Sequence, residues 1–178
     1  MVRDLARFRF EQAVAVARDL NINRIVLHHG YIPNTGPPPR WVERCGRFWQ
    51  EFLQDKPESL RIHLENVFET GPELIAEVVD SIGDPRLNIC LDIGHVSCFS
   101  KGDCVAWIRH LKNRIGYVHL HDNHGQKDEH RGLGEGNIPL VEVCEALDES
   151  APDAIWALEC QVDKMMISHD WLSTHGFI

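Results

Sequence analysis

Hydrophobic residues along the chain repeat with two alternating periods. Short runs rich in β-branched and aliphatic residues are typical of strands buried in a parallel sheet. Longer segments between them carry apolar residues three or four positions apart, which is the spacing of a helix with one buried face. The runs that predict strands are RIVLH (24–28), RIHLEN (61–66), LNICLD (87–92), IGYVHLH (115–121) and AIWALE (154–159).

Segments with the helical period separate these strands. Strands that alternate with helices imply an α/β fold in which parallel strands are joined by right-handed crossovers. Thr70 to Glu73 have the spacing of a capping box, and Asp103 and Asn137 can cap the helices that follow them. Helices are predicted over 10–20, 40–53, 73–82, 105–114 and 140–147, with one more after the last strand.

Composition fits one globular domain over residues 1–178. The chain is 43% hydrophobic and 25% charged, which supplies enough apolar side chains for a single core. It has no apolar run long enough for a bilayer, and MVRDLARFRF lacks the features of a secretory signal, so we expect a cytoplasmic protein. The six cysteines form no C-x-x-C pair and are expected to be reduced. A net charge of -9 disfavours nucleic acid as a partner without excluding a local basic groove.

Each predicted strand ends in a residue that can bind a metal ion or move a proton. The carboxyl ends of parallel strands meet on one face of an α/β fold, where active sites lie, so these side chains are expected to converge. Imidazole and carboxylate donors without paired cysteines suit Zn²⁺, Mn²⁺ or another first-row divalent ion at a catalytic site. The five residues are His28, Glu65, Asp92, His119 and Glu159.

The spacing of these strand ends favours a barrel. Successive ends are 37, 27, 27 and 40 residues apart, from positions 28, 65, 92, 119 and 159. A (β/α)8 barrel of about 250 residues allots roughly 31 residues to each unit. Many further histidine and carboxylate side chains, which could bind a metal ion, lie in HLHDNHGQKDEHRGLGEG (119–136). This segment is a strand end followed by a glycine-rich loop.

Six motifs in order resemble the xylose isomerase-like TIM barrel superfamily. That superfamily contains sugar phosphate isomerases and epimerases together with the AP endonuclease family 2, or endonuclease IV, group. The resemblance implies a (β/α)8 TIM-barrel-like fold, of which about five βα units are present and the N-terminal strands are lacking. The motifs are VLHHG (26–30), LEN (64–66), LDIGH (91–95), VHLHD (118–122), DEHRGLGEGNI (128–138) and LE (158–159).

The same resemblance implies two sets of metal ligands. Glu65, Asp92, His119 and Glu159 match the ligands that the superfamily shares, and multinuclear members use further ligands that match His28, His95, Asp128 and His130.

Other histidines carry weaker signals. His119 and His121 share one strand face, so their spacing does not choose between them, and the resemblance favours His119. His29 and His124 are expected in exposed loops, and His63 and His110 as packed or surface residues.

Three functions remain open at this site. The first is a divalent-metal-dependent isomerase or epimerase acting on a sugar or sugar phosphate, in which Glu65 and Glu159 move protons next to a carbonyl through an enediolate that the metal stabilises. The second is an endonuclease IV-like phosphodiesterase acting on abasic DNA. The third is a degenerate barrel that binds metal without catalysis.

The first function is favoured by motif details. LDIGHVSCFSKG lacks the T-C-H-A-F pattern that we associate with the nucleases, and HDNHGQKDEH lacks their N-D-S-K run. Zn²⁺ or Mn²⁺ is the expected cofactor, with Co²⁺ and Mg²⁺ as alternatives. Lys127 or Arg131 is expected to bind a sugar hydroxyl or a substrate phosphate.

A barrel of five units leaves two unpaired sheet edges and, we expect, an uncovered apolar interior. Such surfaces associate, so we expect a homo-oligomer or a fragment of a longer chain. Phe8, Phe10 and Val14 of the first helix are expected to cover part of the opening.

Overall fold

The computed structural model describes residues 2–100 and 103–178 of the chain. Met1, Lys101 and Gly102, which the predicted single domain includes, lie outside the described residues. Five parallel strands form one sheet in which the spatial order follows the chain order. The strands are β1 (Arg24–His28), β2 (Arg61–Glu65), β3 (Leu87–Asp92), β4 (Ile115–Leu120) and β5 (Ile155–Leu158).

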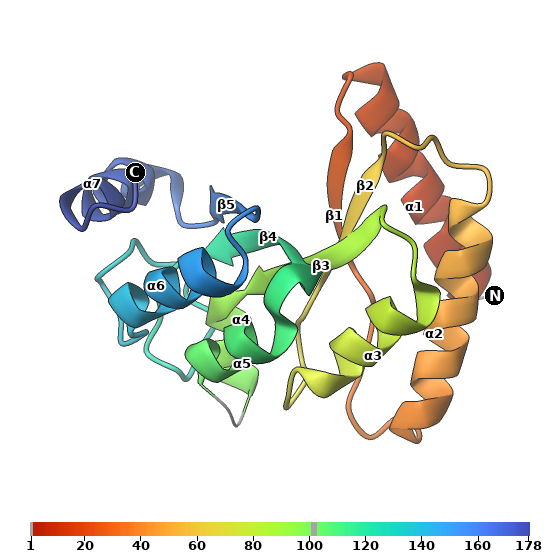
Figure 1. The fold of residues 1–178 in the computed structure, drawn as a ribbon, viewed down its shortest axis with the longest axis horizontal. Coiled ribbons are helices and arrows are strands. Elements are labelled where there is room, and N and C mark those ends of the chain that lie inside the picture. Colours follow the sequence, from red (N-terminus) through yellow and green to blue (C-terminus); the bar gives the residue numbers. More distant parts are fainter. Residues whose placement is uncertain (1, 101–102) are drawn as a thin grey trace.

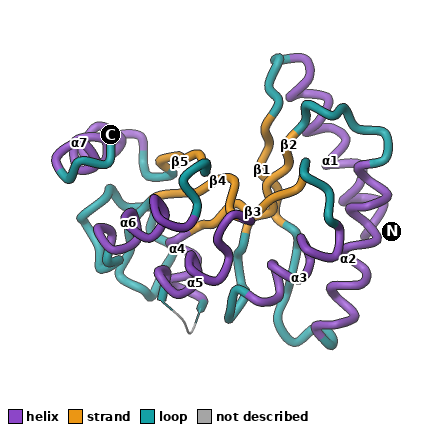
Figure 2. Tube along the Cα trace, viewed as in Figure 1, coloured by secondary structure: helices purple, strands orange, loops and turns teal. Residues whose placement is uncertain are grey.

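Helices lie along one side of the curved sheet (Figures 1 and 2). The last of them, α7, lies beyond β5 at the opposite end of the view from α1 (Figure 1). The arrangement confirms the predicted α/β fold, a TIM-barrel-like partial barrel. The helices are α1 (Val2–Asp19), α2 (Pro38–Leu53), α3 (Glu73–Ile82), α4 (Ile93–Phe99), α5 (Cys104–Leu111), α6 (Leu140–Ser150) and α7 (Met165–Thr174).

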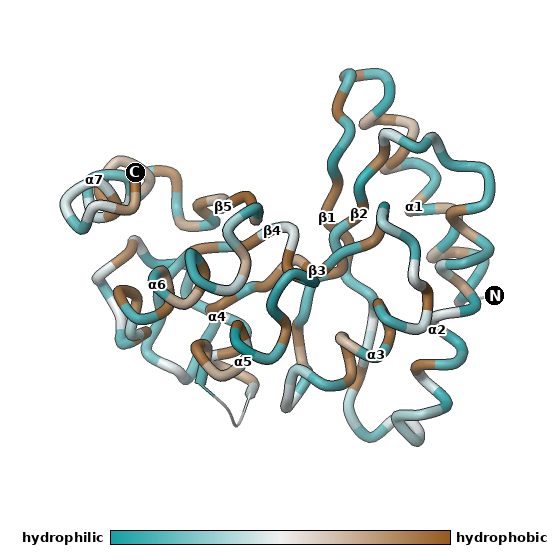
Figure 3. The backbone as a smooth tube through the Cα atoms, in the orientation of Figure 1, coloured by the Kyte–Doolittle hydropathy of each residue, from teal (hydrophilic) through white to brown (hydrophobic). Residues whose placement is uncertain are grey.

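The core lies between the sheet and these helices. Alternate strand residues point toward the helices, as the two-residue period of a strand requires. Burying each large apolar side chain there contributes about 1.5–3 kcal/mol. Figure 3 shows hydrophobic residues on the strands and on the helix sides that face them. The strand side of this core consists of Ile62, Leu64, Ile89, Leu91, Val118 and Leu120, and the largest buried helix residues are Trp49, Phe52, Trp107 and Ile108.

The other side of the sheet is mostly polar. Strand alternation places on it the residues between the core positions, among them Arg24, His63 and Asn88. The middle of this face carries Cys90 and Tyr117, which are partners in the β3–β4 register. The expectation of an uncovered apolar interior is therefore wrong, because the inner positions that a complete barrel fills with branched aliphatic residues are occupied here largely by polar ones.

The first helix packs on the outside of the sheet. Phe10 stacks on Trp49 of α2 with ring centroids 5.2 Å apart, and Phe8 is exposed. Val14 is partly buried against the same core. The expectation that these residues cover the barrel opening is wrong, because α2 offers α1 an aromatic surface on the helical side.

Of the three predicted helix caps, one is formed and two are not. Asp103 caps α5 as predicted, accepting the N–H of Ala106 at 2.6 Å. The capping box is not formed, because Pro72 precedes α3 without a side-chain cap. Helix α6 begins after Pro139 rather than at Asn137. Helix α4 was not predicted.

All six cysteines are free thiols, and five of them are buried. Burial raises the pKa of Cys104 to about 12, which makes it an inert core residue. Among the described residues, no helix combines the length and apolar character needed to cross a bilayer.

Candidate metal centre

Four side chains at the carboxyl ends of β2 to β5 converge on one point. Each of Glu65, Asp92, His119 and Glu159 offers one ligand atom, and these atoms lie within 4.8 Å of one another. The Nδ1 atom of His119 is 3.0 Å from Glu65 Oε1, 3.6 Å from Asp92 Oδ2 and 2.8 Å from Glu159 Oε2. We call these four residues the first group.

The strand register places the first group. Asp92 is the partner of His119 across β3 and β4, so the ends of these two strands lie side by side. Asn66, just after β2, donates to the carbonyl of Asp92 at 3.0 Å and accepts its N–H at 2.8 Å. His28 is the register partner of Glu65, and its Nε2 atom lies 3.0 Å from Glu65 Oε2.

The charges in the first group are strongly coupled. Burial alone would raise the pKa of the Glu65 carboxyl, but hydrogen bonds from His119 and His28 outweigh it and lower that pKa to about 2. Burial also acts against the charged form of Asp92, yet hydrogen bonds from His119 and His121 hold its pKa below the usual range. The pKa of His119 is raised, because its bonds to carboxylates outweigh its burial. Three carboxylates this close repel one another unless a cation lies among them.

A second group lies directly beside the first. It consists of His121, Asp128 and His130, whose ligand atoms also lie within 4.8 Å of one another. His130 Nε2 is 3.0 Å from Asp128 Oδ2, and the rings of His121 and His130 stack at 4.3 Å. His95 Nε2 approaches the same Asp128 oxygen at 3.2 Å. Asp92 links the two groups, because its Oδ1 atom is 3.1 Å from His121 Nε2.

Both groups have the donor chemistry of a divalent ion site. Asp128 Oδ1 is buried and has no hydrogen-bond partner, which is costly unless something binds it. The donors are imidazole nitrogens and carboxylate oxygens, a set that suits Zn²⁺ and Mn²⁺. Glu65, Asp92, His119 and Glu159 would hold one ion, and Asp128 and His130 with His95 or His121 a second.

The structure brings the eight predicted ligands together at one end of the sheet. His28 is the most open of them, with 63% of its side chain exposed. Lys127 and Arg131 line one surface pocket together with Asp128. The guanidinium of Arg131 donates to Glu129 Oε1 at 3.0 and 2.9 Å.

The structure also shows where the remaining histidines lie. His29 is buried and its Nε2 atom bonds to Glu69, so the expected exposed position is wrong. A single sequence gives no sign of this, because the partner Glu69 lies in another loop. His121 and His119 point to different groups, a choice that their shared strand face left open. His63 is packed, as allowed, and His124 is exposed, as predicted.

Comparison with known proteins identifies the family. The family model described as xylose isomerase-like TIM barrel matches residues 2–175. The chain belongs to this family. The chain is 32% identical over 179 residues to an uncharacterized protein of Methanocaldococcus jannaschii, covering 89% of this chain and 57% of that protein. A probable endonuclease 4 of Mycobacterium tuberculosis is 26% identical over 182 residues, covering 86% of this chain and 69% of that one.

Two solved structures have the same fold as this chain. A D-tagatose 3-epimerase-like protein superposes with a TM-score of 0.78 at 28% identity, over 98% of this chain and 69% of that one. The IolI protein, crystallised with a zinc atom, superposes with a TM-score of 0.73 at 15% identity, over 96% of this chain and 66% of that one. This chain therefore spans between just over half and about two thirds of the length of these relatives.

Proposed function

We propose that the first group catalyses the divalent-metal-dependent epimerisation or isomerisation of a sugar or sugar phosphate, by proton transfer next to a carbonyl. The observation that carries this proposal is the convergence of Glu65 and Glu159 on His119 from separate strands. Similarity to the D-tagatose 3-epimerase-like protein supports the substrate class.

The two glutamates differ in their surroundings. The side chain of Glu65 is only 6% exposed and is held ionised by His28 and His119, whereas that of Glu159 is 42% exposed. A bound divalent ion would polarise the carbonyl and stabilise the charge that develops when the adjacent proton leaves. Glu65 and Glu159 are at the ends of β2 and β5, so the two carboxylates could reach opposite faces of a sugar carbon held between them. One carboxylate removes the proton and the other returns it.

Lys127 and Arg131 are the proposed contacts for the rest of the substrate. They lie beside Asp128 in one pocket, so a hydroxyl or phosphate group there would be close to the second group.

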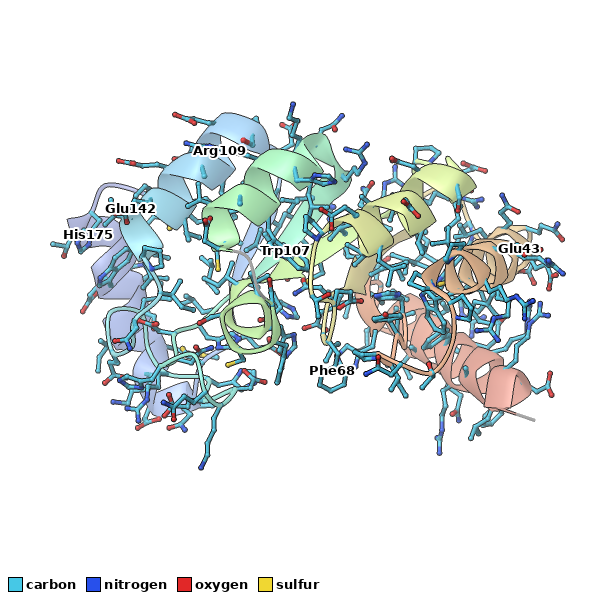
Figure 4. All side chains as sticks on the ribbon, turned by 90° about the horizontal axis from the view of Figure 1, so that it is seen from below. Glu43, Phe68, Trp107, Arg109, Glu142 and His175 are labelled. Atoms are coloured by element: carbon cyan, nitrogen blue, oxygen red, sulfur yellow. The ribbon has the colours of Figure 1, made fainter. Side chains whose placement is uncertain are left out.

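The test is deuterium exchange. A ketose panel incubated in D₂O with the Zn²⁺- or Mn²⁺-loaded protein should gain deuterium on the carbon next to the carbonyl, and Glu159→Gln should suppress this. Glu43→Gln is the matched control, because Glu43 lies on α2 with a side chain that is 68% exposed (Figure 4). Exchange that is equal in both variants would contradict the role of Glu159.

Metal binding by the first group is tested separately. Removing a ligand should cost at least the roughly 10–100-fold in affinity that changes outside the ligand shell produce. Titration with Zn²⁺, Mn²⁺ and Co²⁺ should show this loss for Glu65→Gln combined with Asp92→Asn. An unchanged affinity would contradict the ligand assignment.

An abasic-site endonuclease is the second candidate. It is favoured by the second group, which provides ligands for a further ion, and by the similarity to the probable endonuclease 4. An abasic duplex should remain uncut under the conditions of the exchange assay. Cleavage without sugar exchange would reverse the order of the two candidates.

A further inference from the structure

Two fully buried polar residues follow β4 and take no part in either proposed reaction. Asp122 and Asn123 are both 0% exposed. They come directly after His121 and before the loop that carries Asp128 and His130.

The Asp122 carboxylate holds the far end of this loop. Its oxygens accept the backbone N–H groups of Gly134 at 3.1 Å, Gly136 at 2.8 Å and Ile138 at 3.2 Å, and that of Asn123 at 2.8 Å. The loop approaches so closely that a Cβ atom at position 136 would lie 2.3 Å from Asp122 Oδ1. Glycine is therefore required there by the buried carboxylate.

The backbone of Asp122 holds the middle of the same loop. It exchanges two hydrogen bonds with Arg131, at 3.1 and 3.0 Å. Arg131 directly follows His130, so these bonds fix the backbone at one ligand of the second group.

Asn123 connects the loop to α4, which carries His95. Its Nδ2 atom donates to the carbonyl of Gly94 at 3.0 Å, and its Oδ1 atom accepts from Ser97 Oγ and from the N–H of Gly125, both at 2.9 Å. The loop returns on the other side, where Asn137 donates its N–H to the Asn123 carbonyl at 2.8 Å.

The first group depends on other contacts. Glu65, Asp92 and His119 stand on paired strands, and Asn66 holds the backbone of Asp92. These three residues are therefore positioned by hydrogen bonds other than those that hold the loop. The fourth, Glu159, is joined to the loop, because its carbonyl lies 2.7 Å from His130 Nδ1.

We propose that Asp122 and Asn123 are positioning residues that assemble the second group together with His95, and so set how many divalent ions the chain binds. This inference rests on the proposed metal centre. It does not depend on which reaction the centre catalyses.

The test is the zinc stoichiometry of the full chain, measured by equilibrium dialysis and elemental analysis. Asp122→Asn keeps the size of the side chain but replaces one carboxylate oxygen with an NH₂ group. This group is a donor and faces backbone N–H groups, which are donors too. We expect the affinity for the second ion to fall 10- to 100-fold, and the affinity for the first ion to fall much less, because Glu65, Asp92 and His119 are held by other contacts. Asp103→Asn is the matched control, because it alters the exposed N-cap of α5, which belongs to neither group, and should leave both affinities unchanged.

Two further variants keep the test decisive. Ser97→Ala removes a single bond to Asn123, and should weaken the second ion to a smaller extent if Asp122→Asn does not fold. Asn66→Ala should weaken the first ion through Asp92 more than it weakens the second.

Limited proteolysis provides a readout without metal. With chelator present, trypsin should cut Asp122→Asn after Lys127 or Arg131 at least 10-fold faster than the parent chain, and Asp103→Asn should be cut at the parent rate. If the parent binds no zinc but this difference in cleavage is seen, the proposed metal centre is contradicted and the proposed positioning role of Asp122 is supported. Equal cleavage, or equal loss of both ions in a folded Asp122→Asn protein, would overturn the inference.

Discussion

Gly94→Ala tests how closely α4 is fitted against the end of β4. A Cβ atom at position 94 would lie 1.9, 2.4 and 2.7 Å from Cε1, Nε2 and Nδ1 of His121. His121 is fully buried, is stacked on His130 and is bonded to Asp92, so it cannot move aside without losing these contacts.

The magnitude follows from two opposing effects. Overpacking a buried site typically costs about 1–3 kcal/mol, and replacing a helical glycine with alanine returns roughly 0.5–1 kcal/mol. Gly94→Ala should therefore destabilise the parent chain by about 1–2 kcal/mol. In a His121→Ala background the three nearest atoms are gone, so the same change should be neutral or stabilising by up to ~1 kcal/mol.

The parent chain, the two single variants and the double variant form a double-mutant cycle. Their free energies of unfolding are measured by urea unfolding in the presence of chelator, followed by tryptophan fluorescence. The coupling energy between positions 94 and 121 should be about 1–3 kcal/mol. Gly36→Ala is the control, because a Cβ atom there would meet nothing within 4 Å. The fit of α4 against His121 would be refuted by an equal effect of Gly94→Ala in both backgrounds.

Two further predictions concern acid stability and association. Burial, with smaller contributions from Arg24 and Arg61, lowers the pKa of His63 from its ordinary 6.5 to about 4, so the unfolded chain takes up this proton first as the pH falls. The free energy of unfolding that depends on neutral His63 is fully present above pH 6.5 and is lost toward pH 4, by ~2 kcal/mol at pH 5. Urea titrations at pH 7 and pH 5 should show that His63→Leu removes this loss. An unchanged pH dependence in the variant would contradict the prediction. Strands β1 and β5 are the edges of the sheet, and we expect chains to associate through them. Light scattering at micromolar concentration should show this association, and a compact, cooperative monomer would contradict it.

The strands could be predicted from the sequence because their signal is local. Each run of aliphatic residues has the period of a buried strand, and each ends at or next to a polar residue that could bind a metal, such as Glu65 or His119. Parallel topology requires these ends to meet, which predicts that the five strand-end residues converge. The resemblance to the family, and not the period, selects the four residues of the first group among them.

The remaining features depend on contacts between distant segments. Helix α4 begins at Asp92, which caps it by accepting the N–H of His95 at 2.7 Å, so a predicted ligand also starts an unpredicted helix. His29 is buried by Glu69, forty positions away. The polar inner face follows the two-residue alternation of β2 and β3, whereas the buried Asp122 has no periodic pattern that could reveal it.

The order of the strands has a consequence for the time course of synthesis. Each strand pairs with the one made just before it, so no part of the sheet has to wait for a distant segment. Glu65, Asp92 and His119 can thus meet while the chain is still being made. Glu159 follows His119 by 40 residues, which at about 5–20 residues per second is a delay of roughly 2–8 seconds. During synthesis, three of the four first-group residues are therefore in place before Glu159, the third carboxylate, completes the group.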